Sequence, residues 1–113
     1  MSVITAQRLD AIRELNDTAR QTFTGCAVCL TSSVAAIDPD IRKVLLDKVR
    51  RFDEFDPGND PHGEHDMGFI ELYGERFMWK FDYYDRAVEN ASPDPSDPTK
   101  TTRLLHVLYA HEY

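Results

Sequence analysis

The residues best suited to chemistry lie in one short segment, NDPHGEHDMG, at residues 59–68. His62 and His65 supply imidazole nitrogens, and Asp60, Glu64 and Asp66 supply carboxylate oxygens. A mixed set of nitrogen and oxygen ligands suits zinc, manganese or iron, and an open coordination position would activate a water molecule. One hypothesis is therefore a metal-dependent hydrolase or nuclease that uses His62, Glu64, His65 and Asp66.

The same segment also fits a loop whose polar groups bond one another. It is rich in glycine and proline, whereas zincin-type motifs place two histidines four residues apart on a helix. Asn59 and Asp60 precede Pro61, a pattern typical of an Asx-type turn onto nearby N–H groups. We favour this second interpretation, and we expect no cofactor and no bound metal.

Acidic side chains dominate the charge of the chain. It has 20 Asp and Glu residues against 13 Lys and Arg, a formal net charge of −7. Residues 53–66 contain six of these carboxylates and no lysine or arginine. This balance argues against direct binding to nucleic acid, because gripping a phosphate backbone requires a surplus of basic residues. It suits a protein partner that has a basic surface.

The length of 113 residues predicts a single domain, residues 1–113, around one hydrophobic core. No apolar run is long enough to cross a membrane, and the first residues lack the basic and apolar regions of a secretory signal. We therefore expect a cytoplasmic protein without membrane contact. Cys26 and Cys29 lie three apart in a predicted strand, so they point to opposite faces and are expected to stay reduced, without a shared metal or disulfide.

A helix and a strand are predicted in the first third of the chain. The helix spans about residues 5–22, with Gly25 following its end. Its apolar face contains Leu9, Ile12, Leu15, Ala19 and Phe23, and the remaining positions contain Asp10, Arg13, Glu14, Asp17 and Arg20. Residues 26–34 then read as a short strand with Cys26, Val28 and Leu30 on one face.

Clear start signals predict a second helix over about residues 38–52. Asp38 is a suitable N-cap, Pro39 suits the first helical position, and Asp40 complements the positive end of the helix dipole. The stripe expected to be buried consists of Ile41, Val44, Leu45, Val49 and Phe52.

Two alternating runs at residues 68–85 predict a β-hairpin. With Gly74 and Glu75 as the central residues of a type II′ turn, Leu72 pairs with Phe77 and Ile70 with Trp79. One face is then apolar, and Glu71 lies on the other face diagonal to Lys80. The apolar face consists of Ile70, Leu72, Phe77, Trp79 and Phe81.

The last segment, Thr101–Tyr113, fits either a helix or a strand. Both faces of a strand would be fairly apolar, which suits a central strand, and we favour that assignment. The whole chain then predicts an α+β fold with two N-terminal helices packed on a three- to four-stranded antiparallel sheet with a central β-hairpin.

From about Asn16 onward the sequence resembles a bacterial family known as the domain of unknown function 3768. The matching stretches are LND, TFTG, residues 38–52, NDPHGEHDMG, GERFMWKFDYYD, SPDPSDP and TTRLLHVLYAHEY. The resemblance implies a small bacterial protein of a kind often carried on plasmids and other mobile elements. It implies no activity, cofactor or catalytic residue.

These observations favour a protein-interaction or inhibitor module that is not an enzyme. Its concrete form would be a mobile-element accessory protein that blocks a nucleic-acid-binding defence machine by presenting carboxylates in place of phosphates. A third hypothesis is a small-ligand sensor that uses Trp79, Tyr83 and Tyr84. The expected interaction surface consists of Asp53, Asp56, Asp60, His62, Glu64, His65, Asp66, Lys80, Asp82 and Tyr84.

Overall fold

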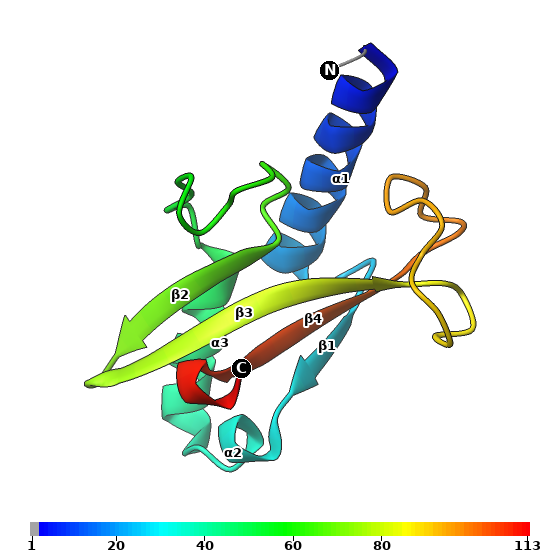
Figure 1. Cartoon of the computed structure of the whole chain (residues 1–113). Helices are drawn as coiled ribbons and strands as arrows, with labels where there is room; N and C mark the ends of the chain where they lie inside the picture. Colours follow the sequence, from blue (N-terminus) through cyan, green and yellow to red (C-terminus); the bar gives the residue numbers. More distant parts are fainter. Residues whose placement is uncertain (1–2) are drawn as a thin grey trace.

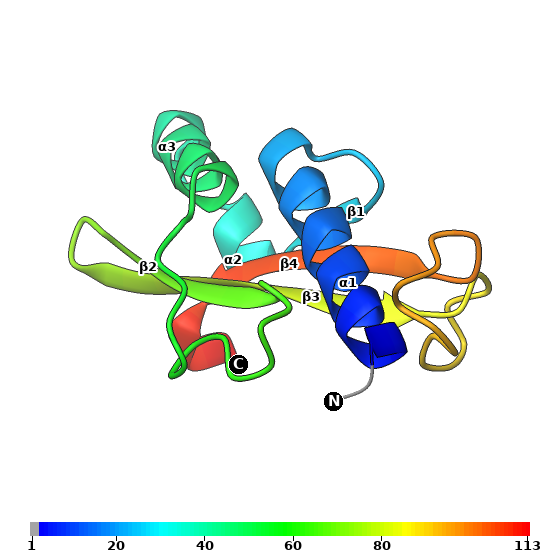
Figure 2. The same ribbon diagram turned by 90° about the horizontal axis from the view of Figure 1, so that it is seen from above.

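A computed structural model describes residues 3–113, with side chains from residue 5 onward, and it is α+β as predicted (Figure 1). The elements in chain order are α1 (Val3–Thr22), β1 (Ala27–Leu30), α2 (Ser32–Ala35), α3 (Pro39–Arg50), β2 (Met67–Leu72), β3 (Glu75–Tyr84), β4 (Thr102–Tyr109) and the 3₁₀ turn η1 (Ala110–Glu112). The three α-helices lie on one face of the sheet, and η1 folds back beneath the other face (Figure 2).

The sheet is mixed, so the prediction of an antiparallel sheet is wrong for one strand. The strand order is β1-β4-β3-β2, with antiparallel pairs β2–β3 and β3–β4 and a parallel pair β1–β4. Alternation of apolar residues defines the buried face of a strand but carries no information on its direction. The segment 102–109 is a strand at the centre of the sheet, which confirms the assignment that we favoured.

The hairpin forms, but its register is two residues from the predicted one. Leu72 pairs with Glu75 and Ile70 with Phe77, so the two loop residues are Tyr73 and Gly74. Both have positive φ, 50° and 77°, as a type I′ turn requires, and the predicted type II′ turn is wrong. A shift of two residues leaves every side chain on its expected face.

The apolar face of the hairpin forms the core as predicted. Trp79 is fully buried and its ring meets Phe52 and Phe81 edge-to-face at centroid distances of 5.4 and 6.0 Å. Gly68 is required beside them, because a Cβ there would lie 2.6 Å from Phe52 and 2.7 Å from the Trp79 ring. Glu71 pairs with Arg76 at 3.4 Å and not with Lys80, as the corrected register dictates.

The predicted start of α3 is confirmed, and its buried stripe is confirmed in part. The Asp38 side chain accepts a hydrogen bond from the Asp40 N–H, and Pro39 is the first helical residue. Leu45 and Val49 are buried, whereas Ile41 and Val44 are 37% and 39% exposed. The N-terminal half of the helix therefore presents apolar atoms to solvent.

The predicted strand at residues 26–34 ends early, at Leu30. Thr31 caps the short helix α2 by accepting a hydrogen bond from the Val34 N–H, and this local capping outcompetes continuation of the strand. Cys26, Val28 and Leu30 pack against the core from one face, as predicted, and both cysteines are free thiols. No helix in the described part of the chain combines the length and apolarity that crossing a bilayer requires.

The turn geometry yields a stability prediction at Tyr73. Tyr73 is 74% exposed and holds a positive φ that a bulky side chain disfavours, whereas asparagine adopts this region readily. We expect Tyr73→Asn to raise the free energy of unfolding by about 0.5–1 kcal/mol in urea denaturation. Tyr73→Phe is the matched control and should have no effect. A loss of stability in Tyr73→Asn would indicate that residue 73 is an extended strand residue, as the type II′ register requires.

Candidate functional site

A buried polar cluster joins α1 to the loop 51–66 and to the central strands. Asn16 is completely buried, and its side-chain amide donates to the Glu64 carbonyl at 3.1 Å and to the Tyr83 hydroxyl at 2.7 Å. Its side-chain carbonyl accepts from Arg103 Nε at 2.9 Å. One amide therefore joins three segments, and all of its hydrogen-bonding directions point into protein.

Arg103 enters this cluster from β4. Only 4% of the residue is exposed, its Nη2 group donates to the Pro95 carbonyl, and its guanidinium carbon lies 5.3 Å from the centre of the Tyr83 ring. Burial lowers the pKa of Arg103 and raises the pKa of Tyr83. Tyr83 is therefore a neutral hydroxyl at physiological pH, and Arg103 remains a cation because its ordinary pKa is so high.

A second set of contacts holds the histidine of the loop. His65 Nδ1 lies 2.9 Å from Asp17 Oδ1, its Nε2 lies 3.7 Å from Asp60 Oδ2, and its ring stacks on Phe55 at 3.7 Å. Arg20 donates to the same Asp17 oxygen at 3.1 Å. His65 is thus enclosed by two carboxylates and an aromatic ring, and it positions the loop against α1.

Arg20, predicted to lie outside the apolar face of the first helix, is buried. It is 1% exposed, and its Nη2 donates to the Phe52 carbonyl at 3.1 Å. Its guanidinium lies 5.3 and 5.0 Å from the ring centres of Phe55 and Trp79. Among the described residues its Nε has no hydrogen-bond partner, so these rings and Asp17 supply the remaining stabilisation of the guanidinium.

The loop also satisfies many of its own backbone groups, as the turn pattern predicted. Asp56 Oδ1 accepts from the N–H groups of Gly58 and Asn59, and the Asn59 amide donates to the Glu54 carbonyl. Asp60 Oδ1 accepts from the His65 N–H at 3.0 Å. These bonds fix the conformation of the loop.

Glu64 and Asp66 form the most negative part of the site. Burial raises the pKa of both carboxyls. Repulsion from Asp66 and Asp60 raises the pKa of Glu64 further, and a backbone hydrogen bond lowers the pKa of Asp66 in part while Asp60 and Asp82 raise it. The exposed His62 acts in the opposite direction on both. Neither carboxylate forms an ion pair with a lysine or arginine within 4.0 Å in the described part of the chain. Folding therefore leaves two partly buried carboxylates, two residues apart in the chain, without a lysine or arginine within that distance.

The opposite sheet face carries a smaller charge group. Asp82 Oδ2 lies 2.5 Å from Lys80 Nζ and 3.1 Å from His106 Nε2. Burial lowers the pKa of His106. The negative charge of Asp82 raises this pKa, and the positive charge of Lys80 lowers it. The Lys80 ammonium also lies 5.9 Å from the centre of the Tyr113 ring, and Met78 is buried beside η1. This face is therefore covered in part by the segment after β4.

The structure separates the ten predicted surface residues into three groups. Exposed positions are Asp53, Asp56 and His62. Partly buried positions in the loop are Asp60, Glu64, His65 and Asp66. Partly buried positions on the far face of β3 are Lys80, Asp82 and Tyr84. The far face also affects the loop electrostatically, because the negative charge of Asp82 raises the pKa of Asp66.

The residues of the metal hypothesis do not converge. Within residues 5–113, no three His, Cys, Asp or Glu side chains are placed to hold a metal ion together. His65 directs both ring nitrogens at carboxylates that position the loop, Asp17 through a hydrogen bond and Asp60 at 3.7 Å. The sensor hypothesis also lacks a shared surface, because Trp79 is fully buried and Tyr84 lies on the other face of β3.

Four residues of the site were missed from the sequence: Asn16, Asp17, Arg20 and Arg103. A signal existed for two of them. Asn16 lies four residues after Ile12 and three before Ala19, so it interrupts the apolar helix face. Arg103, Leu105 and Val107 are alternate residues of one strand, so their side chains share a face. Because Leu105 and Val107 are apolar, the same pattern places the cation of Arg103 in the core. A polar residue inside an apolar pattern indicates a buried bonding partner.

Comparison with known proteins identifies the family. A family model described as "Protein of unknown function (DUF3768)" matches residues 30–112. The chain belongs to this family. The match includes the acidic loop, the hairpin and β4, whereas α1 lies before it. No curated protein and no solved structure is significantly similar to the chain, so the site is interpreted from its own geometry.

The buried amide yields a prediction for stability. Asn16→Ala leaves the Glu64 carbonyl, the Tyr83 hydroxyl and Arg103 Nε without a partner, so the free energy of unfolding should fall by about 2–4 kcal/mol. Urea denaturation measures the change. Gln21→Ala, at an exposed position of the same helix, should change stability by less than about 0.5 kcal/mol. Equal effects of the two substitutions would contradict a role for Asn16 in joining the segments.

The raised pKa values of Glu64 and Asp66 yield a prediction for pH dependence. A carboxyl with a raised pKa in the folded state binds its proton more tightly there, so its ionisation destabilises the fold as pH rises. Glu64→Gln/Asp66→Asn should therefore be more stable than wild type at neutral pH, and the difference should vanish below the ordinary carboxyl pKa values of 4.5 and 3.8. Thermal denaturation across this pH range tests the prediction, with exposed Glu75→Gln as control. Lower stability of the double variant at neutral pH would contradict it.

Proposed function

We propose that the protein is a protein-interaction module, not an enzyme, that binds a basic protein partner through the acidic loop 53–66. The observation that carries the proposal is the pair Glu64 and Asp66, which the fold buries in part and leaves without a lysine or arginine within 4.0 Å among the described residues. Natural proteins place such destabilising charge where function requires it. A lysine or arginine of a partner would supply the missing positive charge.

The surroundings of this pair suit a macromolecular partner. Asp53, Glu54 and Asp56 are exposed at the start of the loop, and they extend the negative surface toward α3. Asp53 and Glu54 also border a cavity of about 640 Å³ between the end of α3 and the edge strand β2. Lys48 and Arg51 line the same cavity, so a basic side chain of the partner would bind outside it, at the exposed carboxylates of the loop.

The proposed roles within the loop are divided. Asp60 and His65 fix the loop on α1 through their mutual contacts and through Asp17. The rigid loop would then present Asp53, Asp56, Glu64 and Asp66 at a low entropic cost on binding. On the far face of β3, Asp82 reinforces the field at Asp66, whereas Lys80 and Tyr84 would contribute polar contacts at the rim.

An extended row of carboxylates resembles the charge of a phosphate backbone, so a fitting partner is a protein whose basic groove binds nucleic acid. Binding would then be competitive: the loop would occupy the groove and exclude the nucleic acid. This form of the proposal agrees with the inhibitor role inferred for a mobile-element accessory protein. Charge complementarity of this kind accelerates association and makes it dependent on salt.

The proposal predicts the effect of removing loop charge on partner affinity. The full chain is used to capture its partner from the native host, and the affinity for the purified partner is measured calorimetrically. Asp53→Asn/Glu64→Gln should weaken binding by about tenfold at low salt, since two interfacial charges contribute about 1.4 kcal/mol together. Raising the salt concentration should reduce the difference between wild type and variant.

A matched control removes the same charge elsewhere. Glu75→Gln/Glu89→Gln alters two exposed carboxylates outside the loop and should leave affinity unchanged. Equal weakening by both double variants would indicate a general charge effect, and an affinity independent of salt would exclude recognition by charge.

A further inference from the structure

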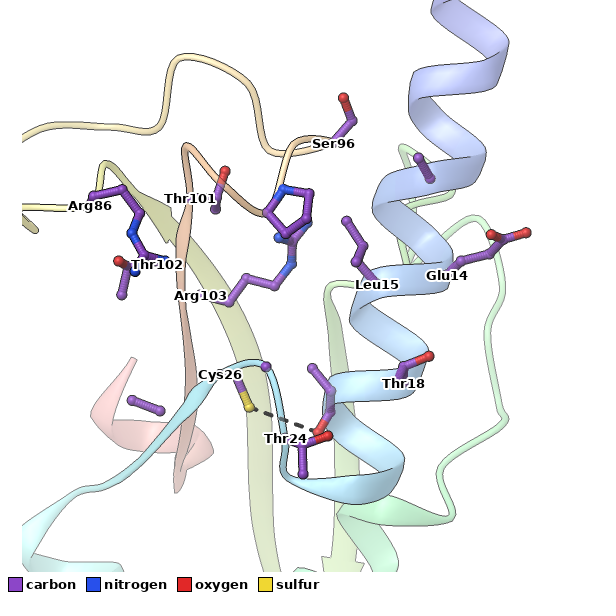
Figure 3. A pocket seen from close by; sticks show the side chains of 15 residues that line it. Glu14, Leu15, Thr18, Thr24, Cys26, Arg86, Ser96, Thr101, Thr102 and Arg103 are labelled. Atoms are coloured by element: carbon purple, nitrogen blue, oxygen red, sulfur yellow. Dashed lines mark hydrogen bonds between the residues drawn. The ribbon is translucent and has the colours of Figure 1, made fainter.

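A cavity lies on the other flank of α1, away from the acidic loop. It has a volume of about 760 Å³, within the range of small-molecule sites. Its walls come from the middle of α1, the turn before β1, the start of β4 and the loop 86–98 (Figure 3). Gly63 of the acidic loop faces Leu9 and Arg13, whereas the cavity contacts Ala11 and Leu15. The two sites therefore share no side chain of α1.

Arg103 brings a buried positive charge to this cavity. Its Nε and Nη2 groups are bound by Asn16 and by the Pro95 carbonyl, and Nη1 makes no hydrogen bond to any residue between 3 and 113. Both bound acceptors are neutral, and no carboxylate of the described chain lies within 4.0 Å of the guanidinium. Buried cations are normally paired with anions, because removal from water is costly for an isolated charge.

Among residues 5–113, no anion completes the pair at contact distance. Glu64 acts on Arg103 only through space, and its backbone carbonyl is the group that binds Asn16. Cys26 lies in the same cavity, but burial raises the pKa of its thiol, and the thiol contacts the Ala19 carbonyl at 3.8 Å (Figure 3). Cys26 is therefore neutral at physiological pH and does not balance the guanidinium.

The remaining wall is suited to an organic molecule with a single negative charge. The α1 side is lined by small or apolar residues, among them Ala11, Leu15 and Ala19. Thr18 and Thr102 contribute hydroxyl groups that can donate to an anion, and Arg86 adds a second guanidinium, whereas the hydroxyls of Ser96 and Thr101 already donate to Asp94. Glu14 also borders the cavity and would repel a polyanion such as a nucleoside triphosphate.

From these features we infer that the cavity binds a small organic carboxylate. Its carboxylate group would meet Arg103, with the threonine hydroxyls and Arg86 around it, and its short apolar body would lie along Ala11, Leu15 and Ala19 of α1. Such a ligand would supply the counter-charge of Arg103 and exclude water from the wall of small side chains. This site is separate from the acidic loop, so it can be present whether or not the loop binds a protein.

The two cysteines provide an internal assay. Cys26 lines the cavity and Cys29 does not, so Cys29→Ser leaves one thiol inside the site and Cys26→Ser leaves one outside it. The rate of alkylation by iodoacetamide is measured for each variant with benzoate, with neutral benzamide or with inorganic phosphate. At a benzoate concentration about ten times its Kd, mass action leaves the site empty about a tenth of the time, so Cys26 should react about tenfold more slowly. The rate at Cys29 should not change.

Substitutions of the cavity arginines test whether the protection of Cys26 by benzoate depends on their positive charge. Arg86→Gln, at an exposed position that should not affect folding, should raise the benzoate concentration required for half-protection, and Arg103→Lys should raise it further. Benzoate should also raise the thermal midpoint of the wild-type protein, and benzamide should not. Equal protection by benzamide, a lack of protection by benzoate, or no effect of either substitution would overturn the proposal. Protection by phosphate as strong as by benzoate would overturn the assignment of an organic ligand.

Discussion

The side-chain amide of Asn16 is the interaction on which the arrangement of α1 depends. Apolar contacts stabilise α1 on the sheet. Because such contacts are not directional, they alone would allow the helix to slide along its axis or rotate about it. The amide meets one backbone carbonyl, one hydroxyl and one guanidinium, which come from the loop, β3 and β4. Only one position of the helix satisfies all three groups. The hydrogen bonds of Asn16 therefore fix where α1 lies on the sheet, and the apolar core stabilises that arrangement.

The two flanks of α1 differ in electrostatic character because of this arrangement. On one flank, Glu64 and Asp66 have excess negative charge, and on the other flank Arg103 has positive charge without a contacting carboxylate. The neutral side chain of Asn16 lies between them and bonds to both segments. The fold thus keeps Arg103 out of contact with the two carboxylates, although Glu64 and Arg103 still act on each other's pKa. In our proposals, each flank would bind a different partner.

Sequence reasoning succeeded where a local signal determines structure. The cap at Asp38, the breaks after α1 and the apolar face of the hairpin depend on neighbouring residues, and they were predicted. The hairpin register failed because an alternating pattern is unchanged by a shift of two residues, so the turn decided between registers. A tyrosine with positive φ at position 73 is an uncommon choice for that turn.

The candidate site was predicted less completely than the fold because its contacts are long-range. The loop and its carboxylates are contiguous and therefore visible in the sequence. The partners of His65 and Arg103, by contrast, lie 48 and 87 residues away in the chain, at Asp17 and Asn16. Residue types alone do not specify such pairs. A buried polar residue within an apolar pattern reveals that a partner exists, but only the tertiary structure identifies it.

The place of β4 between β1 and β3 also dictates an order of events during synthesis. β1 leaves the ribosome early, but the strand that it pairs with is made only after α2, α3, the acidic loop and the whole hairpin. Until then β1 has unpaired backbone groups, and Asn16 lacks the guanidinium of Arg103. Closing so long a loop is entropically costly and slow. The sheet therefore cannot form by adding strands in chain order. The central strand β4 is made after β1, β2 and β3, and it must insert between β1 and β3.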